Sequence, residues 1–279
     1  RARTTRRGGH GLRVRAAVAR GYPGSMPIRL VAFDLDDTLT PSKSPISPEM
    51  AQVLTDLLDA VPVCIISGGQ LEQFTSQVTE RLDLDDRARA HLHLMPTCGT
   101  RYYRYAGTEL ELVYAHDLTA EERSRATETL EVEARRLGLW ETETWGPVLE
   151  DRGSQITFSA LGQRAPLEPK RAWDPTGEKK EALRAAVAPL LPELEVRSGG
   201  STSVDITRSG VDKAYGMTRL AEHTGIDLAD MLFVGDRLDE GGNDYPVKAL
   251  GVPCREVAGA EETPGLVREV LAELAPARR

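Results

Sequence analysis

Three short apolar runs, each followed by polar residues, constrain the fold of this chain most strongly. They are residues 28–33 before Asp34, residues 61–66 before Ser67, and residues 231–234 before Gly235 and Asp236. Such runs are typical of strands buried on both faces, and helical patterns separate them along the chain. Because parallel strands end at one edge of a sheet, we predict a doubly wound, Rossmann-like α/β fold with a polar cleft at that edge.

The middle of the chain has a different pattern. Short alternating runs at 101–105, 110–114 and 155–161 indicate an antiparallel sheet, and residues 121–137 and 178–191 have the periodicity of amphipathic helices. We therefore predict an α+β cap, residues 98–198, inserted into a core formed by residues 27–97 and 199–279.

The charge of the chain bears on its partners. Its 35 basic and 43 acidic side chains give a formal net charge of -8, so no global charge favours nucleic acid or an acidic membrane surface. An anionic substrate must then be held locally. No apolar run reaches the roughly 18 residues of a membrane-spanning helix, so we expect no residence in a membrane. Three widely spaced cysteines suit neither a disulfide framework nor a CxxC metal site, and a reducing cytoplasm is the expected location.

The first 25 residues contain seven arginines and no acid. They lack the apolar stretch of a secretory signal, so residues 1–26 are predicted to form a disordered tail, which leaves Met26 as a candidate start. An organelle presequence and an anion-binding arm are the alternatives.

Two carboxylates two residues apart, Asp34 and Asp36, follow the first predicted strand. A chain that turns off the sheet at this point can direct both side chains into one cleft, where one can act as a nucleophile and the other can move a proton. The alternative is a solvated acidic turn, which is common alone but much less so as this whole pattern after a buried strand.

The run from Asp34 to Thr40 resembles the first motif of the haloacid dehalogenase superfamily, DxDx[TV]. The resemblance implies magnesium-dependent phosphoryl transfer, in which Asp34 attacks phosphorus and Asp36 protonates the leaving oxygen and then activates the next acceptor. It implies that Ser67 and Gly68 bind phosphoryl oxygens, and that the ammonium of Lys213 offsets negative charge. Without the context of the first motif, Ser67 would be interpreted as an ordinary turn residue and Lys213 as a solvated lysine.

The acidic segment from Gly235 to Asp244 resembles the fourth motif of the same superfamily. Hard carboxylate oxygens suit Mg²⁺. By the resemblance, the protein ligands are Asp34, the Asp36 backbone carbonyl and Asp236. Asn243 and Asp244 would support the phosphate, Lys213 and the metal shell, whereas Asp239 and Glu240 are predicted to be solvated charges.

Within the superfamily, the chain from Leu30 onward is similar to subclass IIB and, within it, to the eukaryotic-type phosphomannomutases. The stretches that carry this likeness are 34–40, Arg152-Gly153, 198–205 with Asp212-Lys213, and the double glycine in 235–244. The resemblance implies a C2-type cap that closes over a hexose phosphate, and a homodimer through that cap. Local matches give Arg152 and Arg171 as phosphate-binding arginines, and Ser203 and Asp205 as contacts to the sugar or its distal phosphate. Ordinary exposed basic side chains are the alternative for both arginines.

Three positions depart from the phosphomannomutase pattern. Gln163 interrupts a Gly-Arg pair, Cys98 stands where the family has Asn, and Asp37 stands where it has Gly. A mutase must hold a bisphosphorylated sugar in two orientations, so we expect a phosphatase acting on a sugar or polyol phosphate ahead of a phosphohexomutase. A non-catalytic sugar-phosphate sensor is the third candidate, and the intact set of motif residues argues against it.

Overall fold

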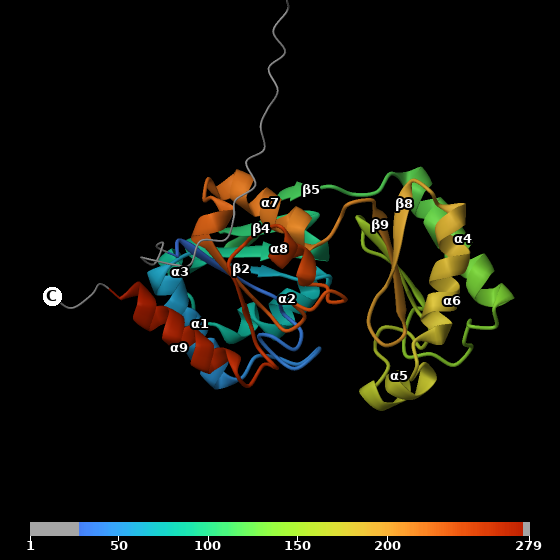
Figure 1. Cartoon of the computed structure of the whole chain (residues 1–279), viewed down its shortest axis with the longest axis horizontal. Coiled ribbons are helices and arrows are strands. Elements are labelled where there is room, and N and C mark those ends of the chain that lie inside the picture. Colours follow the sequence, from blue (N-terminus) through green and yellow to red (C-terminus); the bar gives the residue numbers. More distant parts are fainter. Residues whose placement is uncertain (1–27, 276–279) are drawn as a thin grey trace, which may run out of the picture.

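The computed structural model describes residues 28–275, which form two parts, each with its own sheet (Figure 1). We call residues 28–115 and 213–275 the core, and residues 120–208 the cap. The predicted N-terminal tail, residues 1–26, lies outside the described residues. Between residues 28 and 275, no helix is long and apolar enough to cross a membrane.

The core is built on a seven-stranded sheet in the order β11-β10-β1-β2-β3-β4-β5. Its parallel strands are β1 (Leu30–Phe33), β2 (Val63–Ile66), β3 (Leu92–Met95), β10 (Met231–Gly235) and β11 (Cys254–Glu256). The central strand β1 lies between β2 and β10, and all four of its residues are fully buried. The predicted parallel sheet is therefore confirmed, and the three polar strand ends are neighbours.

Helices cover both faces of this sheet because the side chains of β1 alternate between them. Val31 and Phe33 pack with α1 (Pro48–Ala60) and α9 (Thr263–Leu274), whereas Leu30 and Ala32 pack with α7 (Lys213–Thr224) and α8 (Tyr245–Ala249). Helix α1 is capped by Ser47, whose hydroxyl accepts a hydrogen bond from the Met50 N–H at 3.1 Å. Two short helices, α2 (Leu71–Gln77) and α3 (Asp86–His91), complete the first half of the core.

The cap has a four-stranded antiparallel sheet in the order β6-β7-β9-β8. The strands are β6 (Leu149–Asp151), β7 (Gln155–Ser159), β8 (Leu194–Ser198) and β9 (Ser203–Arg208). Helices α4 (Ala120–Arg136) and α6 (Glu178–Val187) bury their apolar sides against this sheet, and α5 (Leu167–Trp173) lies at one end of the cap (Figure 1). The other face of the sheet is left to the core.

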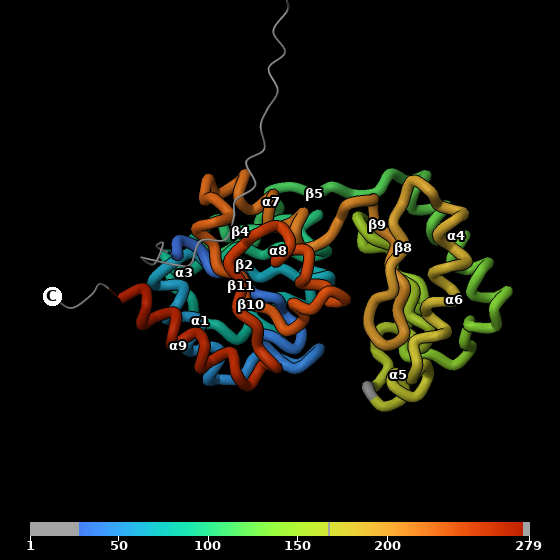
Figure 2. Tube along the Cα trace, viewed as in Figure 1, coloured from blue at the N-terminus to red at the C-terminus, as the bar shows by residue number. Residues whose placement is uncertain are grey.

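Two predicted assignments of strands are wrong. The hairpin of β4 (Arg101–Ala106) and β5 (Glu109–Ala115) extends the core sheet, because β4 pairs with β3, and β9 lies inside the cap sheet, although residues 199–279 were assigned to the core. An alternating pattern predicts a half-buried strand but carries no information on which sheet it joins. The chain crosses between the two parts after β5 and again after β9 (Figure 2).

Candidate active site

A buried lysine joins the carboxylate of Asp34, at the carboxyl end of β1, to that of Asp244, which precedes α8. The Nζ atom of Lys213 lies 2.6 Å from Asp34 Oδ1 and 2.6 Å from Asp244 Oδ1, and the three residues are 1%, 3% and 0% exposed. Lys213 is the first residue of α7, whose N-cap is Asp212. The second oxygen of Asp244 accepts from the Arg237 N–H at 3.1 Å. Buried charges are costly unless paired, so this arrangement holds Lys213 in place beside Asp34.

The ionisation of these groups follows from their burial and from one another. Burial raises the pKa of Asp34; Lys213 opposes this effect, and Asp244 adds to it. Burial alone would lower the pKa of Lys213, but the two carboxylates more than offset burial and raise it. The ammonium is therefore charged at neutral pH, whereas the carboxylate cluster has negative charge in excess.

The carboxylates of this cluster fit a divalent cation. Oxygens of Asp34, Asp236 and Asp244 all lie within 4.8 Å of one another. Both oxygens of Asp244 already accept hydrogen bonds, from Lys213 and from the Arg237 N–H, whereas Asp236 has one such contact, from Thr38 at 3.3 Å. Hard oxygen donors are those that Mg²⁺ prefers. The geometry thus favours Asp34 and Asp236 as ligands and leaves Asp244 to hold Lys213.

The side chain of Asp36 lies outside this cluster. Its two oxygens accept hydrogen bonds from the Lys43 N–H and from Gln73 Nε2, each at 2.8 Å. Its carboxylate is therefore turned toward α2 and the loop 37–44.

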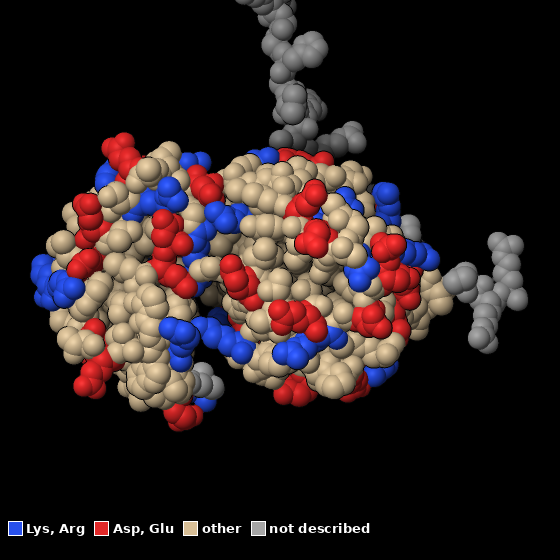
Figure 3. All heavy atoms as spheres, turned by 180° about the vertical axis from the view of Figure 1, so that it is seen from behind, with Lys and Arg blue, Asp and Glu red and all other residues tan. Residues whose placement is uncertain are grey.

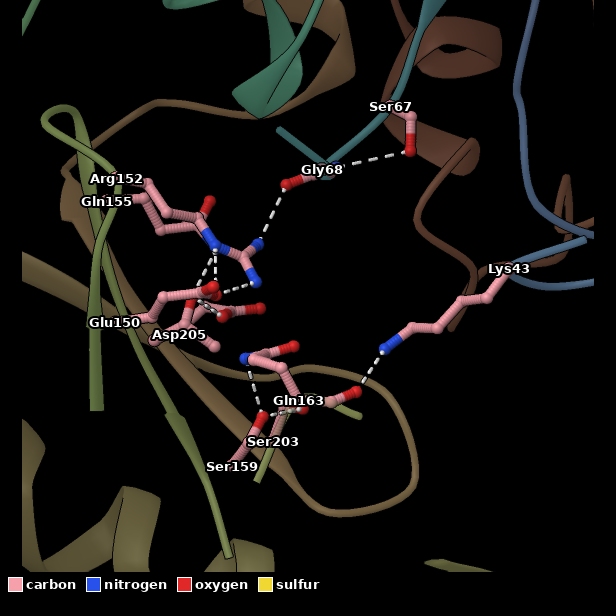
Figure 4. A network of polar contacts seen from close by, with 12 residues as sticks. Lys43, Ser67, Gly68, Glu150, Arg152, Gln155, Ser159, Gln163, Ser203 and Asp205 are labelled. Atoms are coloured by element: carbon pink, nitrogen blue, oxygen red, sulfur yellow. Dashed lines mark hydrogen bonds and ion pairs between the residues drawn. The ribbon is translucent and has the colours of Figure 1, made fainter. Parts of the chain in front are cut away.

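The turn after β2 faces the cap. The hydroxyl of Ser67 is buried and accepts from the Gly69 N–H at 3.3 Å. The carbonyl of Gly68 accepts a hydrogen bond from the Arg152 guanidinium at 3.2 Å, and Arg152 also pairs with Glu150 at 2.7 Å (Figure 4). A cap arginine is thus brought to the predicted phosphate-binding turn.

Ser203 and Asp205 lie near Arg152 on the face of the cap sheet that looks toward the core (Figure 4). Asp205 accepts from the Thr157 hydroxyl at 2.7 Å, and Ser203 Oγ lies 3.2 Å from Ser159 Oγ. Burial raises the pKa of Asp205, and the positive charge of Arg152 opposes this rise. This face of the cap therefore presents hydroxyl and carboxylate groups beside a guanidinium.

Two predicted residues have exposed side chains, and within residues 28–275 no hydrogen bond or ion pair joins either of them to the carboxylate cluster. Arg171 exposes 66% of its side chain, and its ion pair is with Glu168 on the same helix. Asn243 has an exposed side chain. Successive residues of a helix point about 100° apart, so the cap lysine next to Arg171 takes the inward direction.

That lysine, Lys170, and Lys43 of the core were missed by sequence reasoning. Their Nζ atoms converge on the carbonyl oxygen of Gln163, at 3.1 and 3.3 Å, and Lys43 reaches it across the cleft (Figure 4). Burial and the neighbouring charge of Lys43 lower the pKa of Lys170 to about 8. In the sequence, these lysines could be connected to the site only by their neighbours, because Lys43 follows the first motif and Lys170 adjoins Arg171. From behind, Lys and Arg side chains gather at the hollow between core and cap (Figure 3).

Two departures from the phosphomannomutase pattern fall on residues with left-handed backbone. Asp37 has φ 61° and Cys98 has φ 55°. Gly, Asn and Asp tolerate this region better than other residues, and the Asp37 carboxylate supports its own turn by accepting from the Ser42 N–H at 3.0 Å.

Comparisons with known proteins agree with this geometry. A family model described as haloacid dehalogenase-like hydrolase matches residues 171–246. A phosphomannomutase of Schizosaccharomyces pombe is 27% identical over 79% of the chain and 85% of its own length, and one of Saccharomyces cerevisiae is 26% identical over 89% and 94%.

Solved structures resemble the chain in fold. An IMP-nucleotidase of Plasmodium falciparum has a TM-score of 0.66 at 14% identity and covers 88% of this chain and 67% of its own. A haloacid dehalogenase-like hydrolase of Bacteroides thetaiotaomicron has a TM-score of 0.59 at 17% identity over 88% of this chain and 99% of its own.

Proposed function

We propose that the chain is a magnesium-dependent phosphohexomutase of the phosphomannomutase type within the haloacid dehalogenase superfamily, with Asp34 as its nucleophile. The observation that carries this proposal is the buried Lys213, which pairs with Asp34 inside a cluster of the Asp34, Asp236 and Asp244 carboxylates, opposite a cap that bears Arg152 and Lys170. If Asp34 belonged only to a solvated acidic turn, the burial of a lysine between it and Asp244 would have no explanation.

The chemistry follows from these positions. A carboxylate oxygen of Asp34 bonds to phosphorus, and the bond from phosphorus to the sugar oxygen breaks. The sugar oxygen keeps the electron pair of that bond and takes a proton from Asp36. In the return step the acceptor hydroxyl gives its proton to Asp36, its oxygen bonds to phosphorus, and the electron pair of the broken P–O bond returns to Asp34. Lys213 and the donors around Ser67 offset the charge on the phosphoryl oxygens. Mg²⁺ held by Asp34, Asp236 and the Asp36 carbonyl would supply further charge neutralisation.

The mutase reading gains from two lysines. The sequence favours hydrolysis because Gln163 interrupts the arginine pattern of the cap, but Lys43 and Lys170 bring two ammonium groups to that same residue. Two cations there could hold a second phosphate, which a mutase needs and a hydrolase does not. The likeness to named phosphomannomutases over most of the chain supports the same reading. Hydrolysis remains the second candidate, because the neutral side chain of Gln163 does not supply the positive charge of an arginine.

Two assays test the proposal and separate the candidates. With Mg²⁺ and a hexose bisphosphate as activator, the chain should convert mannose 1-phosphate to mannose 6-phosphate. Release of inorganic phosphate from a panel of sugar phosphates without isomerisation would identify a phosphatase instead. Binding of sugar phosphates with neither activity would indicate a sensor, and full turnover by Asp34→Asn would refute the nucleophile.

A further inference from the structure

The proposed acid and base, Asp36, is held by α2 rather than by the carboxylate cluster. Both of its oxygens are taken, one by the Lys43 N–H and the other by the Gln73 side chain. To serve the proposed chemistry it must turn toward phosphorus, and it cannot do so while both contacts persist.

The surroundings of Gln73 support its contact with Asp36. It lies on α2, and its side-chain amide lies beside Gly69, where a Cβ would contact Gln73 Oε1. One turn further on, the buried amide of Gln77 faces the backbone N–H groups of Lys43 and Ser44. Helix α2 therefore supports both donors, one directly and the other through the loop.

Lys43 connects this contact to the cap. Its N–H donates to Asp36, and its ammonium donates to the Gln163 carbonyl of the cap at 3.3 Å. A movement of the cap, or an anion that draws the ammonium toward itself, would therefore act on the loop that holds Asp36.

Building on the proposed function, we propose that Gln73 is a positioning residue that holds Asp36 retracted and so slows the loss of the phosphoryl group to water when no sugar occupies the cleft. In that loss, a water oxygen bonds to phosphorus, Asp36 takes a proton from the water, and the P–O bond to Asp34 breaks with its electron pair returning to Asp34. A retracted Asp36 cannot take the proton. The phosphoenzyme then survives until a sugar phosphate and the cap engage Lys43.

The lifetime of the phosphoenzyme tests this role. The full chain is loaded with radiolabelled mannose 1-phosphate and Mg²⁺, separated from sugar, and followed by acid quench. Gln73→Leu removes the donor, and Gln73→Glu places a like charge beside Asp36. Both variants should lose the label about tenfold faster, a part of the ~10²–10⁴-fold that positioned acid–base groups supply. A first-order decay constant does not depend on how much of a variant is folded.

The matched control is Gln52→Leu, because Gln52 donates to the Asp56 carboxylate at 2.9 Å on the exposed side of α1. Its decay constant should equal that of the wild type, and Asp36→Asn combined with Gln73→Leu should abolish the acceleration. Unchanged or slower decay in both Gln73 variants overturns the retracting role. Failure of the proposed function looks different, since the wild type would then form no label that depends on Asp34.

Discussion

At the scale of the residue, one buried lysine organises the site. Lys213 is almost fully buried, and its only ionic partners among residues 28–275 are Asp34 and Asp244. Removing one partner of a buried ion pair leaves charge without compensation, which costs more than the pair itself contributes. The position of Lys213 therefore concerns both stability and chemistry.

Lys213→Met should lower the free energy of unfolding by about 3–5 kcal/mol, because two buried carboxylates lose their cation. Denaturant titration with unchanged m-value measures the loss. Lys248→Met, at an exposed position of α8, serves as control and should change stability little. Equal stability of both variants would contradict the ion-pair argument.

The depressed pKa of Lys170 predicts how substrate affinity depends on pH. The folded-state pKa of about 8 lies below the usual 10.5, so the ammonium loses its proton as pH rises through about 8. Affinity for the phosphorylated substrate should fall over that range. Lys170→Arg keeps its charge and should flatten the KM profile between pH 7 and 9. A wild-type profile as flat as that of the variant would exclude Lys170 from anion binding. The same shift makes folding stability rise with pH between about 8 and 10.5, because the unfolded chain then binds more protons.

At the scale of the element, the turn 152–154 anchors the cap to the core. The Ser154 hydroxyl lies in a buried network with Thr97 and Thr100, and the Gly153 carbonyl accepts from the Leu118 N–H. Gly153 lies over the bidentate ion pair of Arg101 and Asp117. The same turn carries Arg152 to the Gly68 carbonyl, so its backbone sets the position of a proposed substrate contact.

Gly153→Ala should displace this turn. A Cβ at Gly153 would meet the Arg101 guanidinium, which its ion pair with Asp117 holds in place, and the φ of +78° adds strain of about 1–3 kcal/mol. We expect KM to rise along with the loss of stability. Gly107→Ala is the control. Gly107 has φ +64° and nothing within 4 Å of an added Cβ, so this variant introduces backbone strain without a clash. A KM change as large in Gly107→Ala would refute the positional argument.

At the scale of the whole molecule, core and cap meet across the site by contacts that are few and polar. Arg152 reaches Gly68 and Lys43 reaches Gln163, while each part keeps its own apolar core. Two independent cores joined by such contacts can move relative to one another without unpacking either. The site can therefore open for substrate and close around it.

Magnesium should stabilise the folded chain, because only the folded core brings Asp34 and Asp236 together. Saturating Mg²⁺ should raise the Tm by a few degrees, and EDTA should reverse the rise. Asp236→Asn should abolish this shift, whereas Asp239→Asn, which changes an exposed acid paired with Arg237, should retain it. Retention of the shift in Asp236→Asn would place the ion elsewhere.

The sequence by itself determined what depends on neighbours along the chain. The apolar runs and the acidic residues after β1 and β10 define the parallel sheet and its polar edge, since each signal acts within a few residues. Tertiary structure decided what depends on partners far apart in the chain. It chose the sheet that β4, β5 and β9 join, turned Lys170 inward instead of Arg171, and placed Lys43 against the cap. Alternation and helical spacing specify which face of an element is buried, but the partner of that face is set by packing of the whole chain.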